Sequence, residues 1–412
     1  MEEKKLKIVH IQQYYNEGLG YQENLLPAYQ SNYGHHVVMI TSDLSPDYGF
    51  NKNNRKSSKG KFIENGFTVL RIPIKGEFKG RFVIFSSLYQ YLEEEKPDYI
   101  FHHGVTSPSL FTIAKYKKNN PNTFIAVDNH ADWNIAGKKK AWLLVYYRFF
   151  WKNVLKKIDP YIDVYFGVTP ARNLFLEEEL GVKKNKIKLL PIGADLNGAN
   201  NANTSFREKY NIPKDHLVIT TGGKITKNKS GDILLKAFKQ IKTNKINLIV
   251  FGKVLDPTVI DLIKSDDRII EIPWLNREEI FSLYKEADIG IWNSQHTTLI
   301  EDAVASGLPL ILRYHGSTCH LINESGLFLF DNSVKAVYEA LMLLLSNPVL
   351  LDELRIKTKV HAEKLSYEAV ARESINYFEN QSGQPINNLI MNDQYIDLNN
   401  PNFRKIFHKK IK

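Results

Sequence analysis

Short apolar segments alternate with longer amphipathic segments along the whole chain. This alternation of strands and helices predicts an α/β architecture, in which helices cover both faces of parallel sheets. In the first half, strands are expected at residues 7–11, 36–42, 68–73, 98–103, 124–130, 161–168 and 187–192, with a helix over about 21–33. In the second half, strands are expected at 217–221, 247–251, 269–272, 289–292 and 308–312, with helices over about 231–241, 277–286, 298–306 and from 333 to 379.

Two interruptions of this pattern suggest how the chain is divided. Residues 45–61 lack apolar periodicity and contain many turn formers, which is typical of a mobile loop. The small polar residues around 196–204 are typical of a hinge between domains. The predicted parts are a first domain at 1–195, the hinge at 196–204, a second domain at 205–365, a crossover helix at 366–379 and a basic tail at 380–412.

The length agrees with this division, because 412 residues exceed what one hydrophobic core usually supports. We therefore predict two doubly wound, Rossmann-like domains that face each other across a cleft, with C-terminal helices returning to the first domain. Ligands of such domains bind at the carboxyl ends of the strands.

Composition narrows the compartment and the chemistry. Cys319 is the single cysteine, so an internal disulfide and a thiol-ligated zinc cluster are both excluded. Residues 1–15 carry charges and a short apolar run without a small-residue cleavage site, which favours a buried strand over a signal peptide. No run approaches the roughly 18 apolar residues that a membrane span needs. We expect a cytoplasmic protein, at most peripheral at the inner face of the cell membrane.

The net charge of +10 is distributed unevenly. Residues 1–170 carry +7 and residues 380–412 carry +3, whereas the remainder is neutral. Such asymmetry indicates a polyanionic partner for the first half, which could be nucleic acid, an anionic membrane or a phosphorylated substrate.

A glycine- and lysine-rich segment, residues 222–238, follows an expected strand and opens a helix. Gly223 and its neighbour Gly222 allow the backbone to turn, while Lys224 and Lys229 place ammonium groups near a helix N-terminus that favours anions. The segment could clamp a pyrophosphate, although it lacks the spacing of a P-loop. The alternative is a solvated basic turn that caps the helix.

A second polar segment, residues 288–312, runs from a buried strand into a helix that is expected to begin near Thr297 and Thr298. Free backbone amides there could receive phosphate oxygens, and Glu301, one turn inside the helix, could accept hydrogen bonds from two sugar hydroxyls. Alternatively, Glu301 only opposes the helix dipole.

Polar residues also end the strand expected at 124–130, where Asp128, His130 and Asp132 follow one another closely. Polar side chains at strand ends are well placed for chemistry above a cleft. The alternative is a polar cluster whose members satisfy one another. His103, at the end of the preceding strand, is expected to line the cleft together with His102.

Residues 137–157 contain seven basic side chains, no acidic ones and six aromatic ones. A helix of this composition suits an anionic membrane surface, with rings at the headgroups and cations at the phosphates. A core helix with solvated lysines is the alternative, because apolar residues occur on nearly all its faces. Nucleic acid is disfavoured, since no recognised binding motif is present.

Taken in order, these segments resemble family 4 retaining glycosyltransferases of the GT-B fold, the glycosyl transferases group 1. Gly223 and Lys224 with Lys229 resemble the family's GR…KG element, and residues 301–309, EDAVASGLP, resemble its EAMA(S/C)GLP element. Further similarities are the glycine-rich loop with Gly18 and Gly20, residues 190–195 (LPIGAD), and Pro273 within residues 272–275, where the family's base-contacting loop falls.

The resemblance implies a metal-independent, retaining transfer of a sugar to a hydroxyl group of a lipid-linked surface glycan or polysaccharide. The donor would be a UDP- or GDP-linked sugar, used as a co-substrate without a further cofactor. The second domain would hold the nucleotide and the first the acceptor. His130, Lys224 and Lys229 are the expected catalytic residues, and His103, Asp128 and Asp132 the expected acceptor or cleft residues. The expected donor-binding residues are Gly18, Gly20, Gly223, Lys224, Lys229, Pro273, His296, Thr297, Thr298 and Glu301.

Two positions depart from the family pattern. Lys224 replaces an arginine and offers a point charge in place of a bidentate fork. Asn293 falls where the family has the first glutamate of its E-x7-E motif, and Gln295 and His296 could replace that contact with the donor sugar. These departures make a non-catalytic nucleotide- or glycan-binding relative an alternative function. A nucleotide-sugar 2-epimerase is another alternative, because it has the same two-domain architecture.

Overall fold

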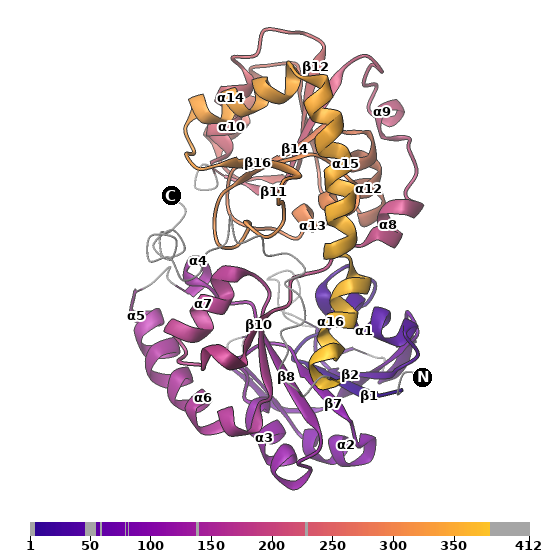
Figure 1. Ribbon diagram of the computed structural model, residues 1–412, viewed down its shortest axis with the longest axis vertical. Coiled ribbons are helices and arrows are strands. Elements are labelled where there is room, and N and C mark those ends of the chain that lie inside the picture. Colours follow the sequence, from indigo (N-terminus) through magenta and orange to yellow (C-terminus); the bar gives the residue numbers. More distant parts are fainter. Residues whose placement is uncertain are drawn as a thin grey trace. The chain divides into compact units, whose positions relative to one another are not determined.

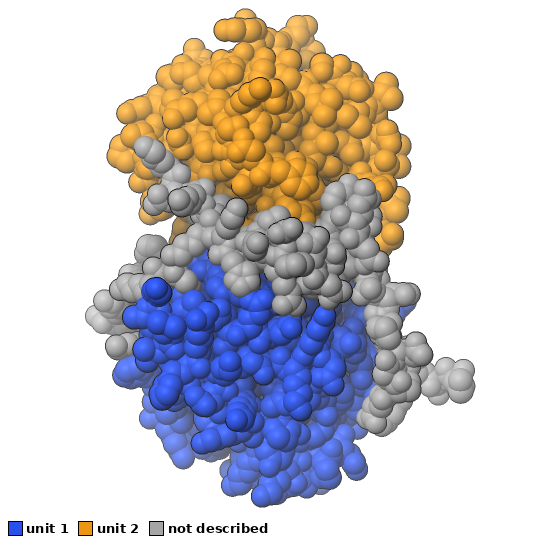
Figure 2. Space-filling view, turned by 60° about the vertical axis from the view of Figure 1, so that its left-hand side comes forward, with its two compact units in different colours: residues 1–191, 370–387 blue, residues 192–369, 388–412 orange. Residues whose placement is uncertain are grey.

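The computed structural model describes residues 5–45, 55–57, 60–78, 80, 82–136, 140–226 and 230–379. Lys229, the basic tail and most of the predicted loop at 45–61 lie outside these residues. The described chain forms two compact units, coloured separately in Figure 2. Unit 1 contains the residues up to Pro191 together with those from Val370, and unit 2 contains Ile192–Ala369.

Among the described residues of unit 1, eight strands form one sheet in the order β10-β9-β8-β7-β1-β2-β4-β3, which is parallel except for β3. The inner strands are buried along most of their length because helices cover both faces of a parallel sheet. β1 pairs with both β7 and β2, so the strand order reverses there. The strands are β1 (Lys7–Gln12), β2 (His36–Ser42), β3 (Lys61–Glu64), β4 (Phe67–Ile72), β7 (Tyr99–His102), β8 (Phe124–Asn129), β9 (Val164–Gly167) and β10 (Ile187–Leu189), with a separate hairpin of β5 (Ile74–Phe78) and β6 (Phe82–Phe85).

The helices of unit 1 lie around its sheet (Figure 1). α7 illustrates the local signals, because Thr169 caps it by accepting from the amide of Arg172 and Pro170 occupies its first turn. The helices are α1 (Gln22–Asn32), α2 (Leu88–Glu95), α3 (Ser109–Asn119), α4 (Trp133–Ala136), α5 (Lys140–Trp142), the π-helical η1 (Leu143–Trp151), α6 (Lys152–Ile158), α7 (Pro170–Glu178) and two short 3-10 helices, η2 (Asp159–Tyr161) and η3 (Lys184–Lys186).

The last described helix, α16 (Tyr367–Glu379), belongs to unit 1 from Val370 onward. The Tyr99 hydroxyl on β7 donates to the Ser374 carbonyl at 3.0 Å, and the Phe378 ring packs edge-on against Tyr99. α16 also lies beside α1, where Gln30 donates to the Ser374 hydroxyl at 2.9 Å (Figure 1). A segment distant in sequence therefore completes the first unit.

The described part of unit 2 has a six-stranded parallel sheet in the order β13-β12-β11-β14-β15-β16. β11 lies between β12 and β14, so the strand order reverses at β11. β12 and β13 follow on one side of it, and β14, β15 and β16 follow on the other. A crevice suited to ligands is expected at the carboxyl end of β11. The strands are β11 (Leu217–Ile225), β12 (Ile246–Val254), β13 (Ile269–Ile272), β14 (Ile289–Trp292), β15 (Leu310–Arg313) and β16 (Gly326–Leu329).

The helices of unit 2 include α12, which begins with a capping box between Asn276 and Glu279. Within the described ranges, no single helix is long and apolar enough to cross a bilayer. Only α14 and α15 taken together have that length and composition, and the two helices meet at a bend of 94°. The helices are α8 (Leu196–Asn201), α9 (Phe206–Lys209), α10 (Gly231–Phe238), α11 (Pro257–Lys264), α12 (Arg277–Glu286), α13 (Leu299–Ala305), α14 (Val334–Leu345) and α15 (Pro348–Leu365).

The segment predicted as a polar hinge contains helix α8. Asp195 caps this helix by accepting from the amide of Gly198 at 3.0 Å. Asp195 also pairs with Arg277 on α12 at 3.0 Å, and Arg277 reaches Asp302 on α13 at the same distance. These contacts attach α8 to unit 2, so residues 196–201 of the predicted hinge form a capped helix of that unit.

Candidate active site

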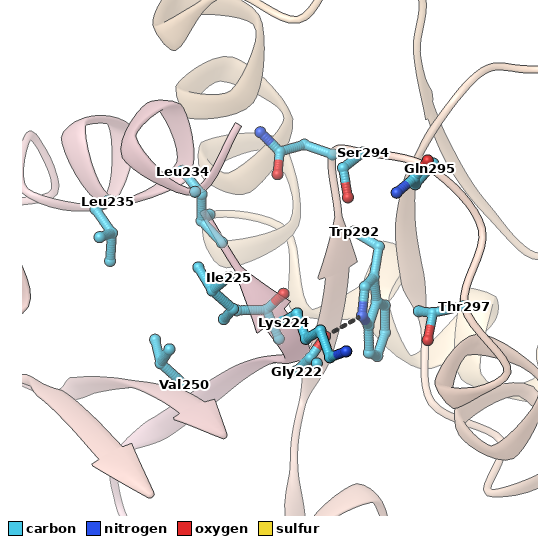
Figure 3. Close-up of a pocket in the computed structure, with 14 residues that line it drawn as sticks. Gly222, Lys224, Ile225, Leu234, Leu235, Val250, Trp292, Ser294, Gln295 and Thr297 are labelled. Carbon is cyan, nitrogen blue, oxygen red and sulfur yellow. Dashed lines mark hydrogen bonds between the residues drawn. The ribbon is translucent and has the colours of Figure 1, made fainter. Parts of the chain in front are cut away.

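A pocket opens in unit 2 at the carboxyl ends of β11 and β14 (Figure 3). The Trp292 ring forms one wall and donates from Nε1 to the Gly222 carbonyl at 3.2 Å. Three of the predicted donor-binding residues, Gly223, Lys224 and Thr297, line this pocket. The other lining residues are Thr221, Gly222, Ile225, Gly231, Leu234, Leu235, Val250, Trp292, Asn293, Ser294 and Gln295.

The two glycines at the end of β11 are required by packing and by backbone geometry. A Cβ atom on Gly222 would lie 2.2 Å from the Phe251 ring. Gly223 has φ +114°, a conformation that side-chain-bearing residues rarely adopt, and its position adjoins Leu299 at the start of α13. Gly222 therefore lets the end of β11 pack closely against Phe251 of β12, and Gly223 lets the backbone turn at the pocket.

Lys224 is exposed at this edge, and the parallel register places Lys253 of β12 beside it. Within the described part of the chain, neither lysine pairs with an acidic side chain. Two adjacent ammonium groups repel each other, and an anion between them would relieve that repulsion. Sequence reasoning missed Lys253, although its position after the apolar strand residues 246–251 and next to Gly252 was a usable signal.

Asn293 has a structural role. Its buried amide donates to the Ser230 carbonyl and to the Asn332 side chain, both at 3.1 Å, and Asn332 donates to the Ser230 hydroxyl at 2.7 Å. Ser230 has φ +59° immediately before α10. The position that is acidic in the family thus fixes the backbone at the start of α10, next to the pocket.

Glu301 on α13 is 1% exposed. Its Oε1 accepts from His296 Nε2 at 2.6 Å, whereas Oε2 has no hydrogen-bond partner among the described residues. A buried carboxylate oxygen without a partner is costly unless a ligand satisfies it. Of the described residues predicted to bind the donor, His296, Thr298, Glu301 and Pro273 are not part of the pocket lining.

Thr298 lies immediately before a helix, and Pro273 lies immediately after a strand. α13 begins at Leu299, and Thr298 precedes it without a capping bond from its side chain. Pro273 follows β13 and is exposed, and its neighbour Trp274 is 53% exposed. An exposed indole at a strand end offers a flat surface on which a nucleobase could stack.

In unit 1, a polar cluster lies at the carboxyl ends of β7 and β8. Asp128 is fully buried and accepts three hydrogen bonds: from the Gly104 amide at 2.7 Å, from His103 Nδ1 at 3.1 Å and from His130 Nε2 at 3.1 Å. Burial raises the pKa of Asp128, but the facing His130 and His103 rings outweigh burial and hold that pKa below its ordinary value. The carboxylate is therefore the stable form, and the His130 side chain, 43% exposed, is the member that reaches solvent.

Two other predicted residues of unit 1 make contacts within the fold. Asp132 is buried and caps α4 by accepting from the amides of Asn134 and Ile135 at 2.9 and 3.0 Å. Gly18, one of the expected donor-binding residues, has φ +71°, and its amide donates to the Glu64 carboxylate at 3.0 Å. Gly20 follows in the same loop.

The helix predicted at 137–157 is formed by α5, η1 and α6 from Lys140 onward. One face is core: Tyr147 packs edge-on against Phe175, and Trp151 is 1% exposed. The other face carries exposed apolar side chains, with Phe149 at 71%. The core interpretation therefore holds for one face of the helix, and the other face is apolar and exposed. Its other exposed apolar residues are Trp142, Leu144, Val145 and Phe150.

Comparison with known proteins agrees with these observations. Residues 202–364 match the family model described as Glycosyl transferases group 1. These residues form a glycosyl transferases group 1 domain. The family resemblance carried by the sequence motifs is confirmed, and the Lys224 pocket lies within this glycosyltransferase domain.

Relatives extend the similarity beyond that domain. Mannosylfructose-phosphate synthase of Agrobacterium fabrum is 24% identical over 39% of this chain, an alignment that spans only 40% of that relative's length. Alpha-monoglucosyldiacylglycerol synthase of Acholeplasma laidlawii is 24% identical over 75% of this chain and 84% of its own. The second alignment covers more of the chain than the family match does.

Solved structures establish the fold. Sucrose-phosphate synthase from Thermosynechococcus elongatus superposes with a TM-score of 0.64, covering 91% of this chain and 98% of that chain at 17% identity. The predicted GT-B fold, built from two Rossmann-like domains, is confirmed.

Proposed function

We propose that this protein is a retaining glycosyltransferase that moves a sugar from a nucleoside-diphosphate donor to a hydroxyl group of a lipid-linked surface glycan. The observation that carries the proposal is the arrangement at the end of β11. Among the described residues, Lys224 is exposed without an acidic partner, and Glu301, on the adjoining helix α13, has one buried oxygen without a hydrogen-bond partner. A nucleoside diphosphate would supply an anion for the first and hydroxyl donors for the second.

In this mechanism, unit 2 holds the nucleotide. Lys224, with Lys229 and Lys253, stabilises the charge that develops on the departing diphosphate, as preorganised electrostatic groups do in other enzymes. Glu301 accepts hydrogen bonds from the ribose hydroxyls, while His296 holds its other oxygen. These ammonium groups would carry the role that a metal ion has elsewhere, so activity should persist in a chelator.

Unit 1 supplies the acceptor side. His130 would lie beside the transferred sugar, as the family resemblance implies, and its exposure leaves the ring accessible. We propose front-side attack by the acceptor hydroxyl, whose proton passes to the leaving phosphate as the new glycosidic bond forms and the bond to the diphosphate breaks. The configuration at the sugar carbon is then retained without a covalent enzyme intermediate.

A lipid-linked acceptor fits the exposed face of η1. Phe149, Phe150 and Val145 are each at least half exposed, and Lys152 and Lys156 are exposed on the following helix, α6. Rings at headgroup depth and cations at lipid phosphates favour an anionic bilayer. A relative whose name denotes synthesis of a glucosyl diacylglycerol is consistent with an acceptor at a membrane. We therefore propose a peripheral protein of cell-envelope polysaccharide biosynthesis at the cytoplasmic membrane face.

Vesicle sedimentation tests the membrane surface. Replacing Lys152 and Lys156 by Gln should weaken binding to phosphatidylglycerol vesicles roughly 30-fold, because each cation near an anionic surface contributes about 1 kcal/mol. The matched control replaces Lys335 and Lys357, exposed lysines on α14 and α15, and should leave binding unchanged. Equal losses in both double variants would contradict this surface.

Transfer itself is tested with purified protein, UDP- and GDP-sugars, and membrane lipid extract in the presence of EDTA. Donor consumption that depends on the extract, with an α-linked product from an α-linked donor, supports the proposal. Formation of an epimer without extract would identify the 2-epimerase instead. Tight nucleotide binding without turnover would identify a non-catalytic relative.

A further inference from the structure

The hairpin of β5 and β6 forms a small sheet of its own in unit 1, and one of its faces is apolar and exposed. Cross-strand pairing places Phe78 opposite Phe82 and Gly76 opposite Ile84, so these four residues share that face. Phe78 is 59% exposed and Ile84 is 51% exposed. Large apolar side chains that are exposed together indicate an interaction surface.

The apolar face of the hairpin continues onto η1 through ring contacts. Phe82 joins the two elements, because its ring stacks on Phe78 with centroids 6.4 Å apart and packs against Tyr146 and Trp151 of η1 at 5.9 and 6.1 Å. The Trp142 ring stacks on Tyr146 at 4.1 Å. The hairpin and η1 therefore form one aromatic surface. Its exposed apolar residues are Phe78, Ile84, Trp142, Val145, Phe149 and Phe150.

The charges on the elements that carry the aromatic surface are mainly positive. Lys75 on β5, Lys140 on α5 and Lys152 on α6 are exposed. The sequence of residues 74–85 and 140–157 contains one acidic residue, Glu77, and Arg55 pairs with it at 2.6 Å. This charge favours an anionic partner. It disfavours a second copy of the same surface, because pairing two copies would bring like charges together.

The opposite face of the hairpin is fixed to the chain that follows β1. Glu77 accepts from the Tyr14 hydroxyl and from two Arg55 nitrogens at 2.6 and 2.8 Å, and the Val83 amide donates to Gln13 Oε1 at 2.8 Å. Gln13 and Tyr14 directly follow β1, where the strand order of the sheet reverses. Ligands of doubly wound sheets bind at such a reversal. The hairpin therefore connects the aromatic surface to the expected ligand-binding edge of unit 1.

We propose that the β5–β6 hairpin enters the headgroup region of an anionic bilayer together with η1, and that it holds the carboxyl end of β1 beside the membrane surface. Its apolar side chains enter the acyl boundary, while the flanking lysines meet lipid phosphates. The hydroxyl group of a lipid-linked acceptor then meets the protein at the end of β1, and its hydrocarbon chain stays in the bilayer. This acceptor route rests on the proposed transferase function, whereas the bilayer contact of the hairpin does not.

Site-specific labelling tests the bilayer contact of the hairpin. Cys319 is the single cysteine and is buried, so an introduced cysteine can be labelled selectively with an environment-sensitive fluorophore. Emission from labelled Ile84→Cys and Phe149→Cys should shift to the blue with phosphatidylglycerol vesicles. The control is Ile356→Cys on α15, a residue that is 65% exposed, and its emission should not shift. A shift at position 149 without one at 84 overturns the proposal, and so does a shift at 84 that needs no vesicles.

Vesicle sedimentation measures what the hairpin contributes to binding. Replacing both Phe78 and Ile84 by Ser should weaken binding to phosphatidylglycerol vesicles roughly 10-fold, because the strength of binding increases with the apolar area that enters the bilayer. The matched control replaces Phe330 and Ile356, exposed residues of unit 2, by Ser and should bind as the wild type does. Circular dichroism shows whether each variant is folded. Equal binding by both folded variants would contradict the proposal.

Transfer assays test the acceptor route. In the variant with Ser at positions 78 and 84, the concentration of lipid-extract vesicles that gives half-maximal transfer should rise about 10-fold, while kcat and KM for the nucleotide sugar stay unchanged. Weaker vesicle binding with an unchanged vesicle dependence of transfer would overturn the acceptor route and leave the bilayer contact standing. If the wild type transfers no sugar, the proposed function fails, and the emission at position 84 still decides whether the hairpin contacts the bilayer.

Discussion

The polar clusters of the two units differ in whether their buried polar groups have hydrogen-bond partners within the described fold. In unit 1, Asp128 and His103 are buried and bonded on every side, and hydrogen bonds through His10 and Gln30 continue inward to α16. In unit 2, Glu301 has a buried oxygen without a partner, and Lys224 is exposed without an acidic neighbour among the described residues. The first cluster is complete without a ligand, whereas the second is incomplete.

The difference indicates what each cluster is for. A fully bonded network is rigid and can hold one exposed side chain, here His130, in a fixed orientation. An unsatisfied buried oxygen costs about 1–3 kcal/mol, which a ligand recovers when it binds. We infer that unit 1 positions a reactive side chain and that unit 2 binds the charged substrate.

The largest expected effect comes from removing the exposed charge of Lys224 in unit 2. Lys224→Ala should lower kcat by about 10²–10³-fold, because one preorganised group that stabilises developing charge is lost. Lys224→Arg, which introduces the residue typical of the family, should retain most of the activity. Steady-state transfer assays measure both.

The control for this charge is Lys236 on α10, which is exposed and pairs with Asp232 at 3.0 Å. Lys236→Ala should leave kcat unchanged. If Lys224→Ala and Lys236→Ala behave alike, the lysine at the end of β11 is a surface charge and the two clusters do not differ as described.

A smaller effect is expected at the unsatisfied carboxylate. Glu301→Gln should weaken nucleotide binding roughly 10- to 100-fold, because a hydrogen bond to a charged group contributes about 1.5–3 kcal/mol. Calorimetry with UDP and 2′-deoxy-UDP, or the guanosine pair, sharpens the test. Loss of the 2′-hydroxyl should weaken binding to the wild type and have little further effect on the variant.

Glu339→Gln on the exposed face of α14 is the matched control. It should bind both nucleotides as the wild type does. If the 2′-hydroxyl contributes equally in wild type and Glu301→Gln, then Glu301 does not contact the ribose.

The smallest expected effect is that the stabilities of the two units change differently as the pH falls. Burial lowers the pKa of both His10 and His102 to about 3, so below pH 6.5 the unfolded chain takes up protons that folded unit 1 does not, and its stability falls as the pH drops. In unit 2, burial raises the pKa of Asp302 to about 7 against the opposing effect of Arg277. Folded unit 2 therefore holds that proton at lower pH, and the stability that Asp302 contributes is lost as the pH rises from about 4 to 7.

Hydrogen exchange measured by mass spectrometry reports each unit separately. Between pH 6.5 and 5.5, β1 and β7 should lose about 1 kcal/mol of protection for each of the two histidines after correction for intrinsic exchange, because the unfolded histidine is only half protonated at pH 6.5. In unit 2, His361, with a pKa lowered to about 4 by burial, offsets Asp302, so β14 and β15 should change less. Equal losses in both units would contradict the assignment of neutral His10 and His102.

Helices and strands with strong sequence signals at their ends were predicted with the most accurate bounds. Residues 269–272, 277–286 and 289–292 have the predicted bounds, because turn formers and the Asn276 capping box mark their ends. The β5–β6 hairpin and β16 were not foreseen. β5 contains Lys75, Gly76 and Glu77 and is stabilised by pairing with β6, a contact that local periodicity does not reveal.

The sequence by itself determined the α/β class, the family resemblance and the position of the site residues at strand ends, because apolar periodicity and glycine spacing are local properties. The tertiary structure decided which of those residues meet. In the folded chain, Asp132 caps α4, Asn293 bonds the backbone at the start of α10, and Lys253 lies beside Lys224. Hydrogen bonds through His10 and Gln30 also connect Asp128 and its neighbours to Ser374, although Gln30 and Ser374 are 344 residues apart in sequence. Contacts of this kind depend on strand order and on the return of α16, and only the folded chain brings such distant groups within hydrogen-bond distance.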